Sequence, residues 1–279
     1  MVRETFEAAH LETLLDALLD VASGGALLDL GCADGLAARL AGPALERYVG
    51  VDLRASTPHL RHDLRDGLGP VGRRPFDLYL GSFGLASHLT PDQLGRLVAD
   101  IARHAHPGAL VALEALGLYS LEWPRLWDTP LGGARTIPYS LGADVPVHPW
   151  HPSELAALLE AHGVRPLHAI DRSVQAGPKV DGCRYWPGLP PLRGALNSLL
   201  DPHSQPAAVA AAENALARPL PPLPAGPAAA VHQALVASRA ELVAYHRGDP
   251  AALARAVWGL EPRLGRGFGH GVLVIGRVA

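Results

Sequence analysis

Lysine, cysteine and long apolar runs are scarce in this sequence, and each shortage excludes a class of protein. Lysine occurs only at Lys179, and arginine brings the basic total to 24 against 27 acidic residues, a net charge of −3. Nucleic-acid-binding domains usually carry a basic patch or stripe, so we expect no nucleic-acid partner. The two cysteines, Cys32 and Cys183, form no CxxC pair and are too few for a disulfide framework.

No stretch of 18 uncharged apolar residues occurs, so the sequence predicts no membrane span. Near the N-terminus, apolar residues from Phe6 to Leu18 recur at the spacing of one helix face and alternate with acidic residues. This pattern indicates an amphipathic helix and not a signal peptide, whose apolar region would be unbroken. We therefore expect a cytoplasmic protein, with the ordinary globular composition of 48% apolar and 18% charged residues.

Between residues 25 and 115, short apolar runs alternate with helical stretches, the pattern of βαβ units and a parallel sheet. Thr90, Pro91 and Gln93 form a typical capped helix start within this region. The predicted strands lie at 26–30, 47–53, near 62–63, at 76–83, 109–117, 164–174 and 268–279. The alternation therefore predicts an α/β fold.

Two segments depart from this alternation. Residues 116–150 are rich in Pro, Gly, Trp and Tyr without a clear period, and we predict a long loop over the sheet edge. Residues 176–266 are helical and interrupted by proline, with a stiff connector at 215–230. The predicted organisation is a core of residues 1–175 plus 267–279, with a helical insertion at 176–266.

The sharpest motif is LLDLGCADG at residues 27–35, between a predicted strand and a helix. A glycine after a strand allows a tight turn and a close approach to a ligand. A dinucleotide-binding loop reads GxGxxG or GxGxxA, and counting from Gly31 and Ala33 places Leu36 at its third small position. This spacing disfavours an NAD-dependent oxidoreductase.

Gly31-x-Ala33-x-Gly35, preceded by Asp29, instead resembles motif I of the class I S-adenosylmethionine (SAM)-dependent methyltransferases. Further elements resemble that family in the same order along residues 24–115. They are an acidic residue ending the second strand (Asp52), another ending the third (Asp63), the FD pair opening the fourth (76–77), and the helix and strand of residues 87–113. Residues 150–175 and 268–279 match the family's last elements more loosely.

The resemblance implies a seven-stranded, mostly parallel, doubly wound Rossmann-like sheet, with the helical insertion before the last strand. It also implies SAM as cofactor, with Asp52 on the ribose hydroxyls, Asp63 at the adenine amino group and Asp29 holding the loop or a water. The implied cofactor-binding residues are Asp29, Gly31, Ala33, Gly35, Asp52, Leu53, Asp63, Leu64 and Ser82. Ala33 stands where the family usually has glycine. Alanine is tolerated at that position if its backbone dihedral angles are ordinary.

Each acidic residue also has a purely structural interpretation. Asp52 could cap the turn that follows it, and Asp63 could pair with Arg61 or Arg65. Cys32 is expected to be a small packed residue and not a nucleophile.

Methyl transfer from a sulfonium is an in-line displacement, so alignment of the acceptor is the enzyme's main task. A general base is needed only when the acceptor carries a proton that must leave. The candidate bases are His88, Glu114, His148 and His151. The HxxH pair formed by the last two lacks an obvious third ligand, so no metal site is predicted.

The sequence thus predicts a methyltransferase acting on an O, N or C atom of a small molecule. A protein or RNA methyltransferase, and a catalytically inert SAM-binding or scaffold relative, stay open as alternatives. The insertion is interpreted either as a lid over the substrate or as an oligomerisation arm, which would make the protein a homodimer.

Overall fold

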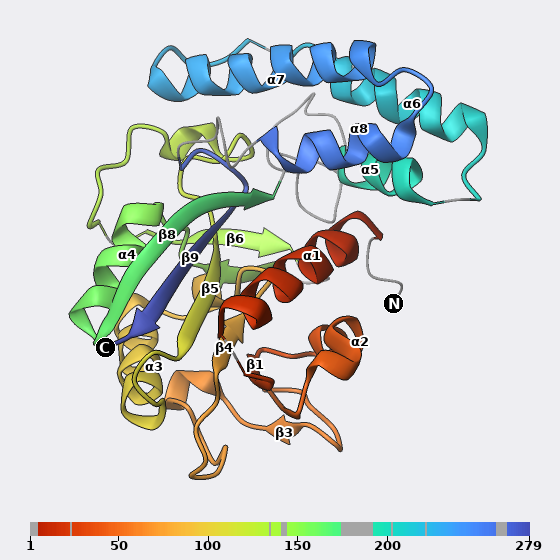
Figure 1. The fold of residues 1–279 in the computed structure, drawn as a ribbon. Helices are drawn as coiled ribbons and strands as arrows, with labels where there is room; N and C mark the ends of the chain where they lie inside the picture. The colour runs from red at the N-terminus through yellow and green to blue at the C-terminus, as the bar shows by residue number, and fades with distance from the viewer. Residues whose placement is uncertain are drawn as a thin grey trace.

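The computed structural model describes residues 5–22, 24–133, 135–140, 144–173, 192–201, 203–220, 222–260 and 267–279. Its centre is a seven-stranded sheet in the order β3-β2-β1-β4-β5-β9-β8 (Figure 1). The strands are β1 (Ala26–Leu30), β2 (Arg47–Asp52), β3 (Leu60–Arg61), β4 (Leu78–Gly81), β5 (Leu110–Leu116), β8 (Val164–Ser173) and β9 (Gly271–Val278). Neighbouring strands from β3 to β5 pair in parallel, whereas β9 is antiparallel to both β5 and β8. The predicted seven-stranded, mostly parallel α/β fold is confirmed.

Helices cover both faces of this sheet, because successive side chains of a strand point to opposite faces. On one face, Leu28 of β1 belongs to the apolar cluster under α3 (Pro91–His104) and α4 (Pro152–Ala161). On the other face, Leu27 packs in the cluster that includes α1 (Thr5–Ala22) and α2 (Leu36–Ala41). Both leucines are fully buried; burial of one such side chain contributes about 1.5–3 kcal/mol.

The α3 helix begins as its sequence predicts. The Thr90 hydroxyl accepts from the Gln93 backbone N–H at 3.3 Å, and the Gln93 side chain accepts from the Thr90 N–H at 2.9 Å. Pro91 occupies the first turn, where a missing N–H costs nothing. The capping box places the apolar stripe of α3 against the sheet.

Between β8 and β9, the described residues form a second group of helices. They are α5 (Leu192–Leu200), α6 (Pro206–Ala217), α7 (Pro227–Tyr245) and α8 (Pro250–Trp258). A separate apolar cluster holds α5, α6 and α8 together, and all four helices gather at one end of the sheet, at the top of Figure 1. The predicted limits of the insertion, residues 176 and 266, lie outside the described residues.

The segment 116–150 is more ordered than the loop that we predicted. It contains a short 3-10 helix, η4 (Pro124–Leu126), and an antiparallel hairpin of β6 (Ile137–Ser140) and β7 (Asp144–Val147). Ile137, Tyr139 and Val147 are buried in alternation with exposed residues, as in a half-buried strand. The prediction was wrong because Pro138 and Pro146, which face each other across the hairpin, hide the strand pattern.

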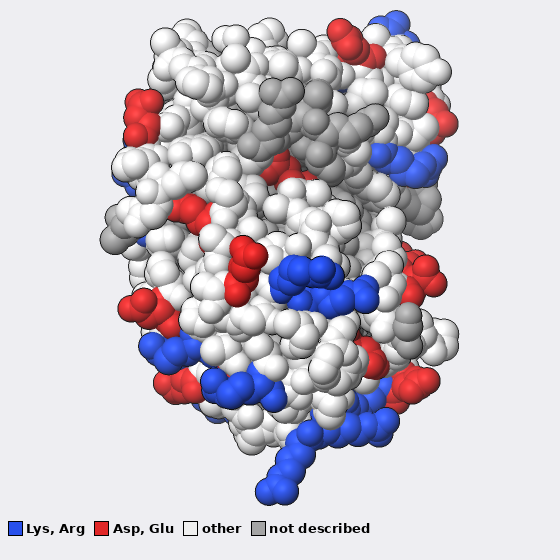
Figure 2. Space-filling model, turned by 60° about the vertical axis from the view of Figure 1, so that its left-hand side comes forward, with Lys and Arg blue, Asp and Glu red and all other residues white. Residues whose placement is uncertain are grey.

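No described helix is long and apolar enough to cross a membrane. On the face drawn in Figure 2, basic and acidic side chains are interspersed among uncharged ones, without a continuous basic stripe among the residues described there.

Candidate active site

The strand order places a switch point between β1 and β4. From β1 the chain continues outward to β2 and β3, then returns to β4 on the other side of β1. In open α/β sheets, ligands bind outside the carboxyl ends of the strands at such a point. Two loops flank it here, residues 31–35 after β1 and residues 82–84 after β4.

The first of these is the glycine loop, and backbone hydrogen bonds hold it against β2. The N–H groups of Gly31 and Cys32 both donate to the Val51 carbonyl, at 2.8 and 3.1 Å. Gly31 has a φ of +72°, and a Cβ there would lie 2.9 Å from the Leu85 side chain. The positive φ favours glycine at position 31, and a Cβ there would also displace the tip of the Leu85 side chain.

Ala33 corrects one expectation, because its backbone is not ordinary. Its φ is +49°, in the left-handed region, where an L side chain costs about 1–2 kcal/mol. The Ala33 side chain is exposed, so the strain comes from its Cβ lying too close to its own backbone and not from packing against other residues.

Replacing Ala33 by glycine should therefore stabilise the protein, by up to about 1 kcal/mol after the added flexibility of the unfolded chain is counted. Urea unfolding of Ala33→Gly measures this change. Ala38→Gly, inside α2, is the matched control and should destabilise by about 0.5–1 kcal/mol. Equal losses in the two variants would contradict the strain at Ala33.

Asp52, at the end of β2, connects the glycine loop to the turn after β2. Its Oδ2 accepts from the Ala33 N–H at 3.1 Å, and its Oδ1 accepts from the Arg54 N–H at 2.8 Å. Asp52 therefore caps the following turn, as its structural interpretation predicts. The carboxylate also joins the two segments where the resemblance places the cofactor ribose. Leu53 beside it is half exposed (49%).

Asp29 lies in β1, directly before the glycine loop, and Cys32 lies within the loop. Asp29 is buried and accepts a hydrogen bond from the Tyr48 hydroxyl at 2.9 Å. Cys32 is also buried, and burial, with the nearby charges of Asp29 and Asp52, raises the pKa of its thiol to about 12. The thiol therefore stays protonated near neutrality, which makes Cys32 a packed residue and a poor nucleophile.

Asp63 caps the 3-10 helix η2 (Leu64–Asp66) and pairs with one of the two arginines considered from sequence. Its carboxylate accepts from the Arg65 backbone N–H at 3.0 Å and from the guanidinium Nε at 2.9 Å. The Arg65 side chain and backbone N–H hold the pKa of this carboxyl below its ordinary value. Leu64 is buried. An adenine contact by this pair stays a prediction.

The loop after β4 contains a strained residue held by one of the candidate bases. Phe83 has a φ of +55°, and a bulky residue in the left-handed region is an outlier. Its N–H donates to Oε2 of the buried Glu114 of β5 at 2.7 Å. Glu114 thereby fixes the turn of residues Ser82 to Gly84 at the switch point. Strained residues of this kind cluster at functional sites.

The three candidate histidines have different surroundings. His88 ends the 3-10 helix η3 (Leu85–His88) and is exposed. His148 is buried with its ring 4.6 Å from that of Trp150, and burial lowers its pKa. Among the described residues, no three His, Cys, Asp or Glu side chains gather as ligands for a metal ion.

His151 caps α4, although the residue types in the sequence favour Ser153 for that role. Its Nδ1 accepts from the Ser153 N–H at 3.3 Å, and its own N–H donates to Glu154 at 3.0 Å. A histidine followed by proline is an unusual cap, whereas serine is among the preferred ones, which is why the sequence pointed to the wrong residue.

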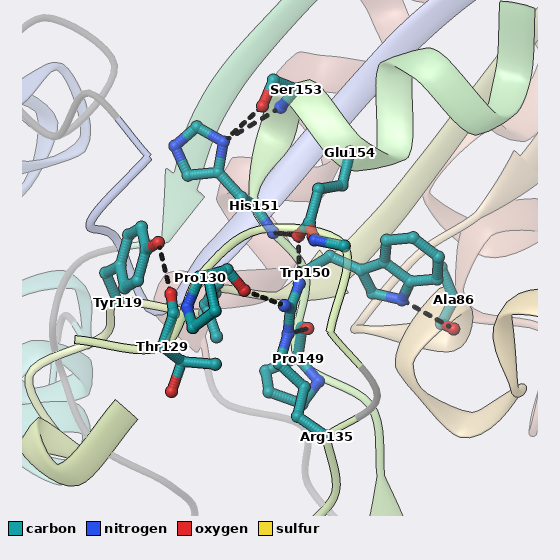
Figure 3. A network of polar contacts seen from close by, with 12 residues as sticks. Ala86, Tyr119, Thr129, Pro130, Arg135, Pro149, Trp150, His151, Ser153 and Glu154 are labelled. Carbon is teal, nitrogen blue, oxygen red and sulfur yellow. Dashed lines mark hydrogen bonds and ion pairs between the residues drawn. The ribbon is translucent and has the colours of Figure 1, made fainter. Parts of the chain in front are cut away.

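Figure 3 shows the network that holds the segment 117–150 onto α4. The buried Arg135 donates to the carbonyls of Pro149 and Pro130 at 3.1 and 3.2 Å, and to Oε2 of Glu154. Glu154 also accepts from the Gly132 N–H at 2.5 Å. One ion pair therefore satisfies several backbone groups of the segment that follows β5.

The helix α7 contacts the same segment through His232. This fully buried side chain stacks on Trp127 at 4.9 Å, and its Nε2 donates to the Tyr119 carbonyl at 2.9 Å. Burial lowers the pKa of His232 to about 4. The helical insertion thus contacts the loop at the carboxyl end of β5.

This histidine predicts an acid-sensitive contact. Its pKa of about 4 in the folded protein lies below the ordinary 6.5, because the folded state favours the neutral ring. This contribution to the free energy of unfolding is complete above pH 6.5 and is lost as the pH falls from 6.5 towards 4. The loss should reach about 1.4 kcal/mol at pH 5.5. Denaturant unfolding at a series of pH values measures this loss. The control is His232→Phe, which keeps an aromatic ring against Trp127 but cannot titrate. Parallel curves for the two proteins would exclude His232 as the cause.

Sequence reasoning missed a buried acid–histidine pair beyond the end of β5, formed by Glu122 and His270. The available signals were an acidic residue within an apolar and aromatic segment, SLEW at 120–123, and a histidine between glycines just before the last strand. Neither signal shows which residues meet, because 148 positions separate them.

Comparisons with known proteins give only distant structural likenesses. No protein-family model and no curated protein matches this chain. A SAM-dependent methyltransferase structure from Archaeoglobus fulgidus has 13% identity and a TM-score of 0.49, covering 97% of this chain and 94% of its own. A SAM-bound amino pentose methyltransferase from Micromonospora echinaspora has 17% identity and a TM-score of 0.42, covering 60% and 85%. A SAM-dependent methyltransferase from Clostridium acetobutylicum has 13% identity and a TM-score of 0.44, covering 64% of this chain and 87% of its own.

Proposed function

We propose that this protein is a SAM-dependent methyltransferase acting on a small molecule. One observation carries the proposal: the carboxylate of Asp52 joins the glycine loop to the end of β2 beside the switch point. This is the place where the motif resemblance puts the acid that binds the cofactor ribose. The glycine spacing, which disfavours a dinucleotide, favours the adenosyl cofactor over NAD.

The chemistry of the donor set fits the cofactor. Each oxygen of Asp52 accepts one backbone N–H, and a carboxylate oxygen can accept two hydrogen bonds, so both can also accept from a ribose hydroxyl. Leu64 offers an apolar contact to the adenine, and Asp63 an acceptor for its amino group. Gly31 and Gly35 let the backbone approach the methionine part of the cofactor without a Cβ in the way.

SAM supplies an electrophilic methyl group on a positively charged sulfur. What the chain contributes is alignment of the acceptor with that methyl group, since orientation is the main source of rate for such a displacement. In this proposal the turn of residues 82–84, fixed by Glu114, lines one side of the acceptor site. The segment 117–150, held by Arg135 and Glu154, lines another.

We further propose that the insertion is a lid over the acceptor. The support is the contact of His232 of α7 with Trp127 and the Tyr119 carbonyl, in the loop that follows β5. A lid would exclude water and complete the acceptor pocket. An oligomerisation arm is the competing interpretation, and the mass of the protein in solution, measured by light scattering, separates the two.

Incubation with SAM labelled in the methyl group, together with a cell extract, tests the function. A small-molecule methyltransferase transfers label to compounds below about 1 kDa, in the size range of a ligand pocket. Label in protein or RNA would support those alternatives. If SAM binds but no fraction becomes labelled, the inert scaffold interpretation replaces this proposal.

A further inference from the structure

The buried pair of Glu122 and His270 lies at the same edge of the sheet as the two loops of the switch point. His270 directly precedes β9, whose first residue pairs with Leu116, the last residue of β5. The His270 carbonyl accepts from the Gly117 N–H at 2.8 Å. A Cβ on Gly84, in the loop after β4, would touch Leu116 at 3.5 Å. Only the strand β5 therefore lies between His270 and the turn that holds Phe83.

The hydrogen bond to Glu122 orients His270 and places the ring proton on Nδ1, because an ionised carboxylate can only accept. Its Nδ1 donates to Oε2 of Glu122 at 2.6 Å, and that oxygen also accepts from the Ser120 hydroxyl. The other ring nitrogen, Nε2, then carries a lone pair, and the Tyr139 hydroxyl lies 3.5 Å from it. A carboxylate that holds one nitrogen of a histidine, leaving the other as acceptor, is the arrangement of a general base.

Of the two members of the pair, His270 is the one placed to contact a ligand. The ring lies 5.8 Å from that of Trp123 and 6.3 Å from that of Tyr139. The His270 side chain retains 7% of its exposure, whereas Glu122 retains 1%, so the imidazole is the member that can meet a ligand. On the insertion side, His232 of α7 lies close enough to interact with the charges of Glu122 and Arg239.

We infer that His270 is the general base of the methyl transfer and that Glu122 is its positioning residue. This inference rests on the proposed function. In the step, a lone pair of the acceptor, which an ammonium group gains only by first giving its proton to Nε2, forms a bond to the methyl carbon. The carbon–sulfur bond breaks with its electrons left on sulfur, which becomes neutral, and the acceptor's proton passes to Nε2. The imidazolium that forms is stabilised by the Glu122 carboxylate.

The inference narrows the substrate class. A base is required only by an acceptor that must lose a proton. The acceptor is therefore a hydroxyl or an ammonium group of a small molecule, and not a carbon nucleophile that reacts before losing its proton.

The test compares the ring NMR resonances of His270 in complexes with SAM and with S-adenosylhomocysteine (SAH), which differ by one methyl group and one positive charge. A sulfonium near Nε2 changes the electric field at the imidazole, so the His270 ring resonances should differ between the two complexes. The chain has 14 histidines. The resonance that disappears in His270→Gln assigns this one, and the exposed His168 of β8 is the control that should not differ.

Two variants keep the test decisive. Glu122→Gln should change the His270 ring resonances in the free protein, because the carboxylate that Nδ1 contacts is lost, and it assigns the resonance if His270→Gln does not fold. With an acceptor identified from the labelling experiment, His270→Gln should lower kcat about 10²–10⁴-fold with the Kd of SAM unchanged.

The outcomes separate the two proposals. Identical His270 ring resonances with SAM and SAH, when both are shown to bind, would overturn the assignment of the base and leave the methyltransferase proposal standing. Failure of SAM to bind at all would overturn both.

Discussion

Replacing Asp52 by alanine is expected to weaken SAM binding by about 1–3 kcal/mol, or about 5–150-fold in Kd. The variant loses the proposed hydrogen bonds from the ribose hydroxyls to a charged acceptor. It also loses the bond from Asp52 to the Ala33 N–H, so the glycine loop must be ordered by the cofactor itself. Isothermal titration calorimetry on the wild type and the variant measures the difference.

Asp34→Ala is the matched control for this variant. Asp34 lies in the same loop, but its carboxylate pairs with Arg39 in solvent, with both side chains more than half exposed. We expect its SAM affinity to stay within twofold of the wild type, about 0.4 kcal/mol. Unchanged affinity in Asp52→Ala would remove Asp52 from the site, and equal losses in both variants would point to a general effect of loop charge.

The largest loss of stability is expected from Glu154→Ala, at about 3–5 kcal/mol. This change leaves the guanidinium of Arg135, whose side chain is 4% exposed, buried without its carboxylate. It also removes the acceptor for the backbone N–H groups of Gly132 and His151. Chemical denaturation followed by far-UV circular dichroism gives the free energy of unfolding of each protein.

Arg103→Ala is the control for this ion pair. The Arg103 side chain is 72% exposed in its contact with Asp100, and a surface pair contributes at most about 1 kcal/mol. If Glu154→Ala were no more destabilising than Arg103→Ala, the Arg135–Glu154 pair would not be what holds residues 117–150 to α4.

The parts of the fold that the sequence predicts are those in which local chemistry agrees with the final packing. The strand before the glycine loop, the Thr90 cap and the strand ending at Asp52 all show their structure within a few residues. A buried parallel strand appears as an uninterrupted apolar run, as in β4. Such features depend little on what lies elsewhere in the chain.

The parts that escaped prediction depend on long-range contacts or on unusual local choices. The β6–β7 hairpin is concealed by two prolines, and His151 caps a helix that a neighbouring serine seemed better suited to begin. The left-handed backbone of Ala33 cannot be inferred from an alanine. The pairing of Glu122 with His270 forms only when β9 returns beside β5, so no local pattern contains it.

The proposed cofactor site and the proposed acceptor site differ in the same way. Asp29, Gly31 and Asp52 lie in or directly after β1 and β2, and a motif of fixed spacing finds them. The proposed acceptor side comprises the turn after β4, the segment after β5 and the residues before β9. These come together through tertiary structure alone, which is why the candidate bases chosen from sequence did not include His270.

Calorimetric titration of the purified chain with SAM, and separately with SAH and NAD, tests the central claim most directly. The account predicts micromolar binding of both adenosyl ligands and no binding of NAD. Absence of binding by either adenosyl ligand, in folded protein free of co-purified cofactor, would contradict it and leave the glycine loop and Asp52 as structural features of the sheet.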